Sequence, residues 1–131
     1  MARSLKATTR IGFALSAAAS MAFTCQIAQA SDAAKGAEVF QQCAACHTVE
    51  KGASNGLGPN LFGVAGNKAA SLPNFAYSAA LKNSGIVWTD DKLKQWILNP
   101  QKTVPGSKMI LIQPLDSQQA DDVVAYLNTK K

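Results

Sequence analysis

Apolar residues near the C-terminus recur at the spacing of one face of a helix. Four of them stand at positions i, i+3, i+4 and i+7: Ala120, Val123, Val124 and Leu127. We expect this helix to start near Ser117, with aspartates in its early turns and lysines at its end, a charge order that the helix dipole favours. The segment predicts the last helix of the fold.

A second helical pattern lies between Thr89 and Asn99. Thr89 is a favourable N-cap and two aspartates follow it in the first turn. Asn99 precedes Pro100, and the residue before a proline resists the helical conformation, so we expect the helix to end there. Its apolar residues recur at helical spacing: Leu93, Trp96 and Ile97.

Two shorter helices are predicted from weaker signals. Residues 33–42 can form a helix after Ser31 or Asp32 as the cap, and residues 78–84 can form one that stops at Gly85, where a left-handed residue is easily accommodated. In the first of these helices, Gly36, Ala37 and Phe40 lie on one face. No alternation typical of strands is present, so the sequence predicts an all-α protein.

Glycine and proline predict loops for much of the remaining chain. Residues 69–77 form a loop broken by Pro73, and Pro105 and Pro114 bracket an irregular segment that contains Met109. Between residues 52 and 66 the chain contains Gly52, Gly56, Gly58, Pro59, Gly63 and Gly66, a composition typical of a loop wrapped closely around another group.

Residues 1–30 have the composition of a cleaved secretory signal peptide. The first ten residues are basic without an acid, residues 11–23 are mostly apolar, and Ala28-Gln29-Ala30 supplies small residues for cleavage after Ala30. A retained membrane anchor is the alternative, but polar residues interrupt the apolar run before the ~20 residues that a spanning helix needs. We expect export to the periplasm and a mature domain of residues 31–131 that is not inserted in the membrane.

Cleavage changes the charge and the supply of possible metal ligands. The whole chain has a formal charge of +5, but the signal carries three of the 13 basic residues and none of the 8 acids, which leaves +2. Nothing in this balance indicates binding to nucleic acid. The mature domain retains one histidine, His47, and one methionine, Met109.

The stretch Cys43-Ala44-Ala45-Cys46-His47 is the attachment signature of a c-type haem. Each thiol would add to one vinyl group of the haem, and the imidazole of His47 would then lie close enough to bind the iron. A structural zinc site would need four ligands, usually in two pairs, and a thioredoxin-like dithiol would need alternating strands and helices. Neither requirement is met, so we expect one covalent haem c.

Met109 is the candidate for the second iron ligand. Most methionines simply fill gaps in a core, and that interpretation remains the alternative. Met109 nevertheless lies in a loop bounded by proline and glycine rather than on an apolar helix face.

Several motifs stand in the order found in one known family. The sequence from residue 32 to 130 resembles the small class I c-type cytochromes, especially the mitochondrial cytochrome c and bacterial cytochrome c2 branch. Besides the haem signature, the motifs are Gly58-Pro59-Asn60-Leu61, Asn74-Phe75-Ala76-Tyr77, Trp88, Asn99-Pro100, Pro105-Gly106-Ser107-Lys108-Met109 and Ala125-Tyr126-Leu127.

The resemblance implies a small cytochrome c fold, with helices and loops wrapped around one haem. The helices around Phe40 and Tyr126 would cross at Gly36. The resemblance also implies that Pro59 accepts a hydrogen bond from His47, that Tyr77, Trp88 and Ser107 bind the haem propionates, and that Lys68 lies near them. Trp96, Leu81 and Leu111 replace more polar or aromatic residues of the family, which makes the expected pocket more apolar.

The sequence therefore predicts a one-electron carrier rather than an enzyme. The alternatives are a haem enzyme subunit and a gas-binding or sensing module with a displaceable Met109. An enzyme would need acid or base groups beside an open iron position, but His47 is already used as a ligand. We expect a monomer that exchanges electrons with redox proteins such as a membrane oxidase, a bc1-type complex, a reaction centre or a periplasmic dehydrogenase.

The low positive charge predicts weak electrostatic steering toward these partners. We expect a largely apolar contact around the haem edge, formed by Val104, Ile110 and Leu111. Lys102 and Lys108 would contribute orientation.

Overall fold

The computed structural model describes residues 29–131. The expected signal peptide lies outside these residues except for its last two positions. Within the described residues the regular elements are helices, and the only β-type pairing is an isolated bridge between Lys68 and Val87, so the all-α prediction is confirmed. The helices are α1 (Ala33–Phe40), α2 (Ala79–Lys82), α3 (Asp90–Leu98), α4 (Pro100–Thr103) and α5 (Ser117–Asn128).

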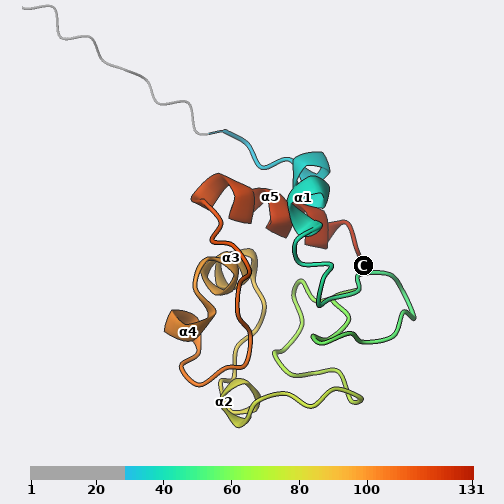
Figure 1. Ribbon diagram of the computed structural model, residues 1–131, viewed down its shortest axis with the longest axis vertical. Coiled ribbons are helices and arrows are strands. Elements are labelled where there is room, and N and C mark those ends of the chain that lie inside the picture. The colour runs from blue at the N-terminus through green and yellow to red at the C-terminus, as the bar shows by residue number, and fades with distance from the viewer. Residues whose placement is uncertain (1–28) are drawn as a thin grey trace, which may run out of the picture.

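Helices α1 and α5 cross at one end of the molecule (Figure 1). The crossing is close because Gly36 has no side chain: a Cβ placed there would overlap the carbonyl group of Asp122 and lie 2.9 Å from the Cβ of Tyr126. The rings of Phe40 and Tyr126 pack beside this point with their centroids 5.3 Å apart. The predicted crossing at Gly36 is therefore present.

A buried carboxylate joins the start of α1 to α5. Asp122 is only 3% exposed, and its Oδ1 accepts hydrogen bonds from the backbone N–H of Asp32 at 2.7 Å and from Nε2 of Gln118 at 3.0 Å. The side chain of Asp32 in turn caps α1 by accepting from the backbone N–H groups of Ala34 and Lys35. This arrangement fixes where α1 begins and how it lies on α5.

Helix α1 ends at Phe40, two residues before the predicted end. The chain then continues in tight turns, in which the N–H of Cys43 donates to the carbonyl of Phe40 at 2.8 Å and the N–H of His47 donates to that of Cys43 at 2.9 Å. The haem signature thus leaves α1 directly, and the docking of α1 on α5 determines its position.

Helix α3 has its predicted N-cap at Thr89, and its last residue is Leu98, with Asn99 as the C-cap before Pro100, where the end was predicted. Asn99 also caps α4, because its side chain accepts from the backbone N–H of Lys102 at 2.9 Å. Helix α4 was not predicted from the sequence. The signal was nevertheless present, since asparagine followed by proline is a favourable way to start a helix as well as to end the preceding one.

The other helix ends agree closely with the sequence. Ser78 caps α2, and Gly85 behind it has a positive φ of 66°, as predicted. Helix α5 starts at Ser117, where Asp116 and Gln119 form a capping box. It ends at Asn128, so the two C-terminal lysines expected at its end lie beyond it.

The core lies between α1, α3 and α5 and extends to α4. Its buried apolar residues are Phe40, Val49, Trp88, Leu93, Trp96, Ile97, Val104, Ala120, Val123, Val124 and Leu127. Val104 is 5% exposed, so the prediction that it takes part in a partner contact is wrong. None of the helices between residues 29 and 131 has the length and apolar character needed to cross a membrane.

Replacement of Gly36 by alanine tests the crossing. Helix propensity alone would make alanine more favourable than glycine by up to about 1 kcal/mol. The overlap with the Asp122 carbonyl should outweigh this gain, and we expect a net loss of about 1–3 kcal/mol in the free energy of unfolding. Denaturant unfolding measures it, with the exposed Lys35→Ala as control. A Gly36→Ala variant as stable as the wild type would contradict the close approach.

Candidate functional site

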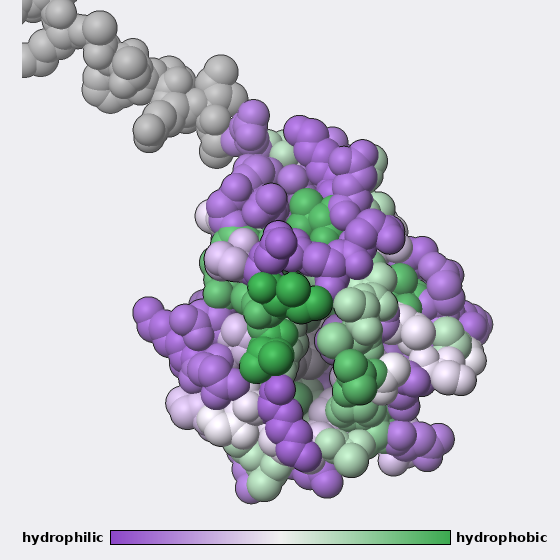
Figure 2. Space-filling model, viewed as in Figure 1, coloured by the Kyte–Doolittle hydropathy of each residue, from purple (hydrophilic) through white to green (hydrophobic). Residues whose placement is uncertain are grey.

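A cavity of about 530 Å³ lies between the long loop that follows the haem signature and the segment around Met109. Figure 2 shows a hollow on this face with apolar surface on both sides. Seven of the eight candidate site residues line the cavity: Cys46, His47, Pro59, Tyr77, Trp88, Ser107 and Met109. Cys43 does not line it and packs against the core instead.

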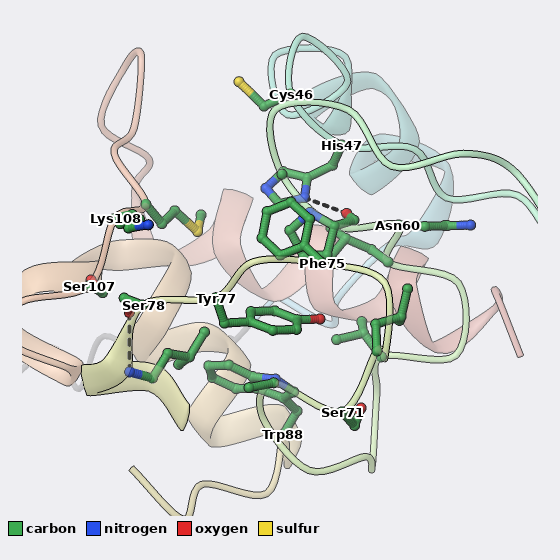
Figure 3. Close-up of a pocket in the computed structure, with 18 of the residues that line it drawn as sticks. Cys46, His47, Asn60, Ser71, Phe75, Tyr77, Ser78, Trp88, Ser107 and Lys108 are labelled. Atoms are coloured by element: carbon green, nitrogen blue, oxygen red, sulfur yellow. Dashed lines mark hydrogen bonds between the residues drawn. The ribbon is translucent and has the colours of Figure 1, made fainter. Parts of the chain in front are cut away.

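His47 is held by a backbone carbonyl. Its Nδ1 lies 2.8 Å from the carbonyl oxygen of Pro59, as the dashed line in Figure 3 marks. A carbonyl oxygen only accepts, so Nδ1 carries the proton and Nε2 retains its lone pair for a metal. Burial lowers the pKa of His47, and the bond to Pro59 opposes this effect in part. Both the tautomer and the neutral form suit a metal ligand.

Gly58 forms a flat support beneath the His47 ring. A Cβ at Gly58 would lie 2.6 Å from Nδ1 and 2.8 Å from Nε2, distances far inside van der Waals contact. The backbone N–H of Gly58 donates to the carbonyl of Cys46 at 2.8 Å, which ties this part of the loop to the haem signature. The ring orientation therefore depends on the absence of a side chain at Gly58.

The loop behind His47 is organised around the buried side chain of Asn60. Its Nδ2 donates to the carbonyls of Glu50 and Ala53 at 2.8 and 2.9 Å, and its Oδ1 accepts from the N–H of Phe62 at 2.9 Å. Asn55 completes the network by accepting from the backbone N–H of Asn60. One amide thus satisfies backbone groups that no helix or strand pairs, and this stabilises the carbonyl of Pro59 in place.

Aromatic rings and aliphatic side chains form the wall that faces His47 (Figure 3). Trp88 and Trp96 are buried against one another with centroids 5.3 Å apart, and Tyr77 meets Phe75 edge-on at 4.9 Å. Burial raises the pKa of the Tyr77 phenol, which favours its neutral, hydrogen-bond-donating form. Leu81 also lines the cavity, in agreement with the expected apolar pocket.

The charged residues around the cavity are few. Lys68 and Lys108 line it, and no aspartate or glutamate does so among the described residues. Of the two neighbours expected at the cavity edge, Ile110 lines the cavity and Leu111 does not. Leu57 and Ile110 both line the cavity and are 85% and 81% exposed, which places apolar side chains at the mouth.

Cys43 and Cys46 are free thiols on the same short turn as His47. Burial raises the pKa of Cys43, and the nearby charge of an ionised Cys46 raises it further. Cys46 lines the cavity, whereas Cys43 packs against the core.

This arrangement fits a haem. An imidazole nitrogen and a thioether sulfur line one largely apolar cavity, and this pair is a common set of haem iron ligands. The cavity also lies within the size range of cofactor pockets, and two thiols stand beside the imidazole at the spacing needed for attachment.

Comparisons with known proteins agree with this geometry. The sequence model of the family described as Cytochrome c matches residues 33–131. The chain belongs to the cytochrome c family. Among its relatives, cytochrome c2 of Blastochloris viridis is 44% identical over 100 residues, which cover 76% of this chain and 79% of the relative. Cytochrome c2 of Rhodoblastus acidophilus is 46% identical over 102 residues, 78% of this chain and 95% of the relative.

A solved structure supports the same assignment. Cytochrome cH from Methylobacterium extorquens superposes with a TM-score of 0.70 and 48% sequence identity, and the match covers 76% of this chain and 100% of that one. The protein is thus a class I c-type cytochrome with the corresponding helical fold. Its family binds one covalently attached haem c and serves electron transport.

Two residues that hold the site in place, Gly58 and Asn60, were not predicted from the sequence to do so. Gly58 and Asn60 flank Pro59 in a motif, but only the folded loop shows that one supports the His47 ring and the other pairs the backbone behind it. The clustering of glycines, proline and asparagine in so short a stretch was the available signal.

Gly58→Ala tests the support of the His47 ring. The added Cβ would push the ring away from its place, so we expect loss of the His47–Pro59 hydrogen bond and poorer presentation of Nε2 as a metal ligand. The proton-coupled nitrogen signals of the imidazole and the optical spectrum of the haem protein measure both effects. Leu57→Ala is the control, because Leu57 is its exposed neighbour. An unchanged imidazole environment in Gly58→Ala would contradict the arrangement.

Proposed function

We propose that this protein is a periplasmic one-electron carrier whose iron is bound by His47 and Met109. Cys43 and Cys46 would be the covalent tethers. The observation that carries the proposal is that His47, fixed by Pro59 with Nε2 available, lines the same cavity as Met109. The sequence features of residues 1–30 support export and a mature domain of residues 31–131.

The haem supplies an iron that cycles between the ferric and ferrous states. The protein residues have to keep its surroundings nearly unchanged in both states. The Pro59 carbonyl keeps the proton on Nδ1 of His47, and the buried Trp88 and Trp96 keep water out of the wall that faces it. A thioether ligand in an apolar cavity favours the ferrous state, so we expect a comparatively high potential.

Three side chains that line the cavity carry polar groups suited to the propionates. Tyr77 has a phenol kept neutral by burial, Trp88 has an indole N–H, and Ser107 has a buried hydroxyl. Each can donate a hydrogen bond to a carboxylate. Lys68 lies on the same cavity and offers a positive charge.

The cavity chemistry favours a carrier over an enzyme. Apart from His47, its titratable side chains are Cys46, Tyr77, Lys68 and Lys108, and none of these is a carboxylate or a second imidazole that could move protons near neutral pH. A gas-binding or sensing module remains the second candidate, because it would use the same His47 with a more easily displaced Met109.

Met109→Ala tests the ligand assignment. The thioethers at Cys43 and Cys46 would still hold the haem, so we expect a folded domain whose iron binds water, cyanide or carbon monoxide more readily. Optical and EPR spectra measure the change from a low-spin to a high-spin or water-bound iron. The neighbouring Ile110→Ala is the control. Unchanged low-spin spectra and an unchanged potential in Met109→Ala would refute the assignment.

We also propose that redox partners dock at the mouth of the cavity through apolar contacts. Leu57 and Ile110 stand exposed on the cavity wall and replace the expected contribution of Val104, which is buried. Lys108 lies beside them and contributes orientation. The partners would be redox proteins such as a membrane oxidase, a bc1-type complex, a reaction centre or a periplasmic dehydrogenase, and the carrier would act as a monomer.

The docking proposal predicts that removing apolar area matters more than reversing charge. We expect Ile110→Ser to lower the second-order rate of electron exchange with the physiological partner, and Ile112→Ser, exposed but outside the cavity wall, to change it less. The rate should fall only slightly between 0.01 and 0.15 M salt, although the screening length shrinks from ~30 to ~8 Å. A steep fall, abolished by Lys102→Glu or Lys108→Glu, would show that charge steering dominates instead.

A further inference from the structure

The segment that carries Met109 has little support of its own. From residue 108 to 115 the chain forms no helix or strand, and Ile110 and Ile112 are 81% and 66% exposed. Within the described residues, this segment makes one hydrogen bond with another protein group, which the carbonyl oxygen of Met109 accepts at 3.3 Å. Met109 and Leu115 pack against the core, but a segment with so few hydrogen bonds opens readily unless a group outside it restrains it.

The donor of this bond is the side-chain amide of Gln101. The same Nε2 lies 2.8 Å from the carbonyl oxygen of Ser107 and 3.1 Å from its hydroxyl. Two carbonyl oxygens can only accept, so the amide has to present its nitrogen rather than its oxygen at this point. One side chain therefore holds the backbone on both sides of Lys108.

Gln101 stands on a firmly anchored turn. It belongs to α4, whose first residue, Pro100, is buried and whose following residue, Val104, is in the core. The hydroxyl of Thr103 donates to the carbonyls of Gln95 and Asn99 at 3.0 and 2.9 Å, which ties α4 to the end of α3. The Gln101 amide thus extends from the anchored helix α4 to the segment around Met109, and its hydrogen bonds restrain that segment.

We propose that Gln101 is a positioning residue that keeps the Met109 segment closed over the cavity. The inference rests on the proposed role of Met109 as the iron ligand. The fraction of molecules in which Met109 has left its place determines how readily an external ligand binds, because such a ligand binds only the open state. Loss of the Gln101 bonds should raise that fraction. The hydroxyl oxygen of Ser107 also accepts from Gln101, which orients this hydroxyl and leaves its hydrogen available to donate to a propionate.

Gln101→Leu in the haem protein tests the inference with two measurements. Cyanide titration of the ferric form should show an affinity raised by roughly two- to tenfold, the range that a net hydrogen-bond contribution corresponds to. Hydrogen exchange of the backbone amides of residues 109–112 should accelerate, while exchange in α1 and α5 should stay unchanged. Gln101→Lys retains a donor group and should restore most of the wild-type behaviour.

Gln113→Leu is the matched control, since it makes the same chemical change in the same segment at an exposed residue outside these bonds. Equal cyanide affinity and equal exchange in Gln101→Leu and the wild type would overturn the inference. Equal increases in Gln113→Leu, or exchange that rises to the same extent in α1 and α5, would overturn it too. A low-spin spectrum retained in Met109→Ala would refute the ligand role instead, whereas exchange in Gln101→Leu tests the restraint whichever residue binds iron.

Discussion

The close approach of α1 and α5 at Gly36 is the constraint on which the rest of the structure depends. Because α1 has no side chain at this point, its backbone rests on the carbonyl of Asp122, and the side chain of the same Asp122 receives the N–H of Asp32. The contact therefore fixes both the position and the rotation of α1. Only a two-residue turn connects α1 to the haem signature, so the position of Cys43, Cys46 and His47 depends on how α1 packs on α5.

The cavity itself is built almost without regular secondary structure. Its loops are held by single side chains that pair several backbone groups at once: Asn60 behind His47 and Gln101 beside Met109. This construction leaves the chain free to follow the outline of a large flat cofactor, which a helix or strand could not do. The stability of these loops also depends on a few side-chain amides, because each amide forms hydrogen bonds with two or three other groups.

The sequence was informative wherever one local rule dominates. Helical periodicity located α3 and α5, and the spacing of two cysteines and a histidine indicated the kind of cofactor that the family binds. The glycine signal placed α2 correctly but set its end at residue 84, whereas the helix ends at Lys82. The sequence was less informative in irregular segments, where no period decides which side chain faces inward. Val104 was expected on the surface and is buried, and Leu111, expected beside Ile110 at the cavity edge, does not line the cavity. The hydrogen bonds of Gln101 to Ser107 and Met109 could not be predicted from the sequence either, because neither a glutamine nor a methionine indicates such a contact.

The pairing of α1 with α5 determines when, during synthesis of the polypeptide, the haem signature gains a packed core. Among the described helices, α1 packs against α5, which is the last of them to be synthesised. The loop behind His47 is closed equally late, because the N–H of Gly63 donates to the carbonyl of Lys130 at 2.6 Å and the Lys130 ammonium pairs with Glu50. Until those last residues arrive, the turn with Cys43 and Cys46 has no finished core behind it. Both sulfurs then remain accessible to covalent modification until α5 has packed against α1.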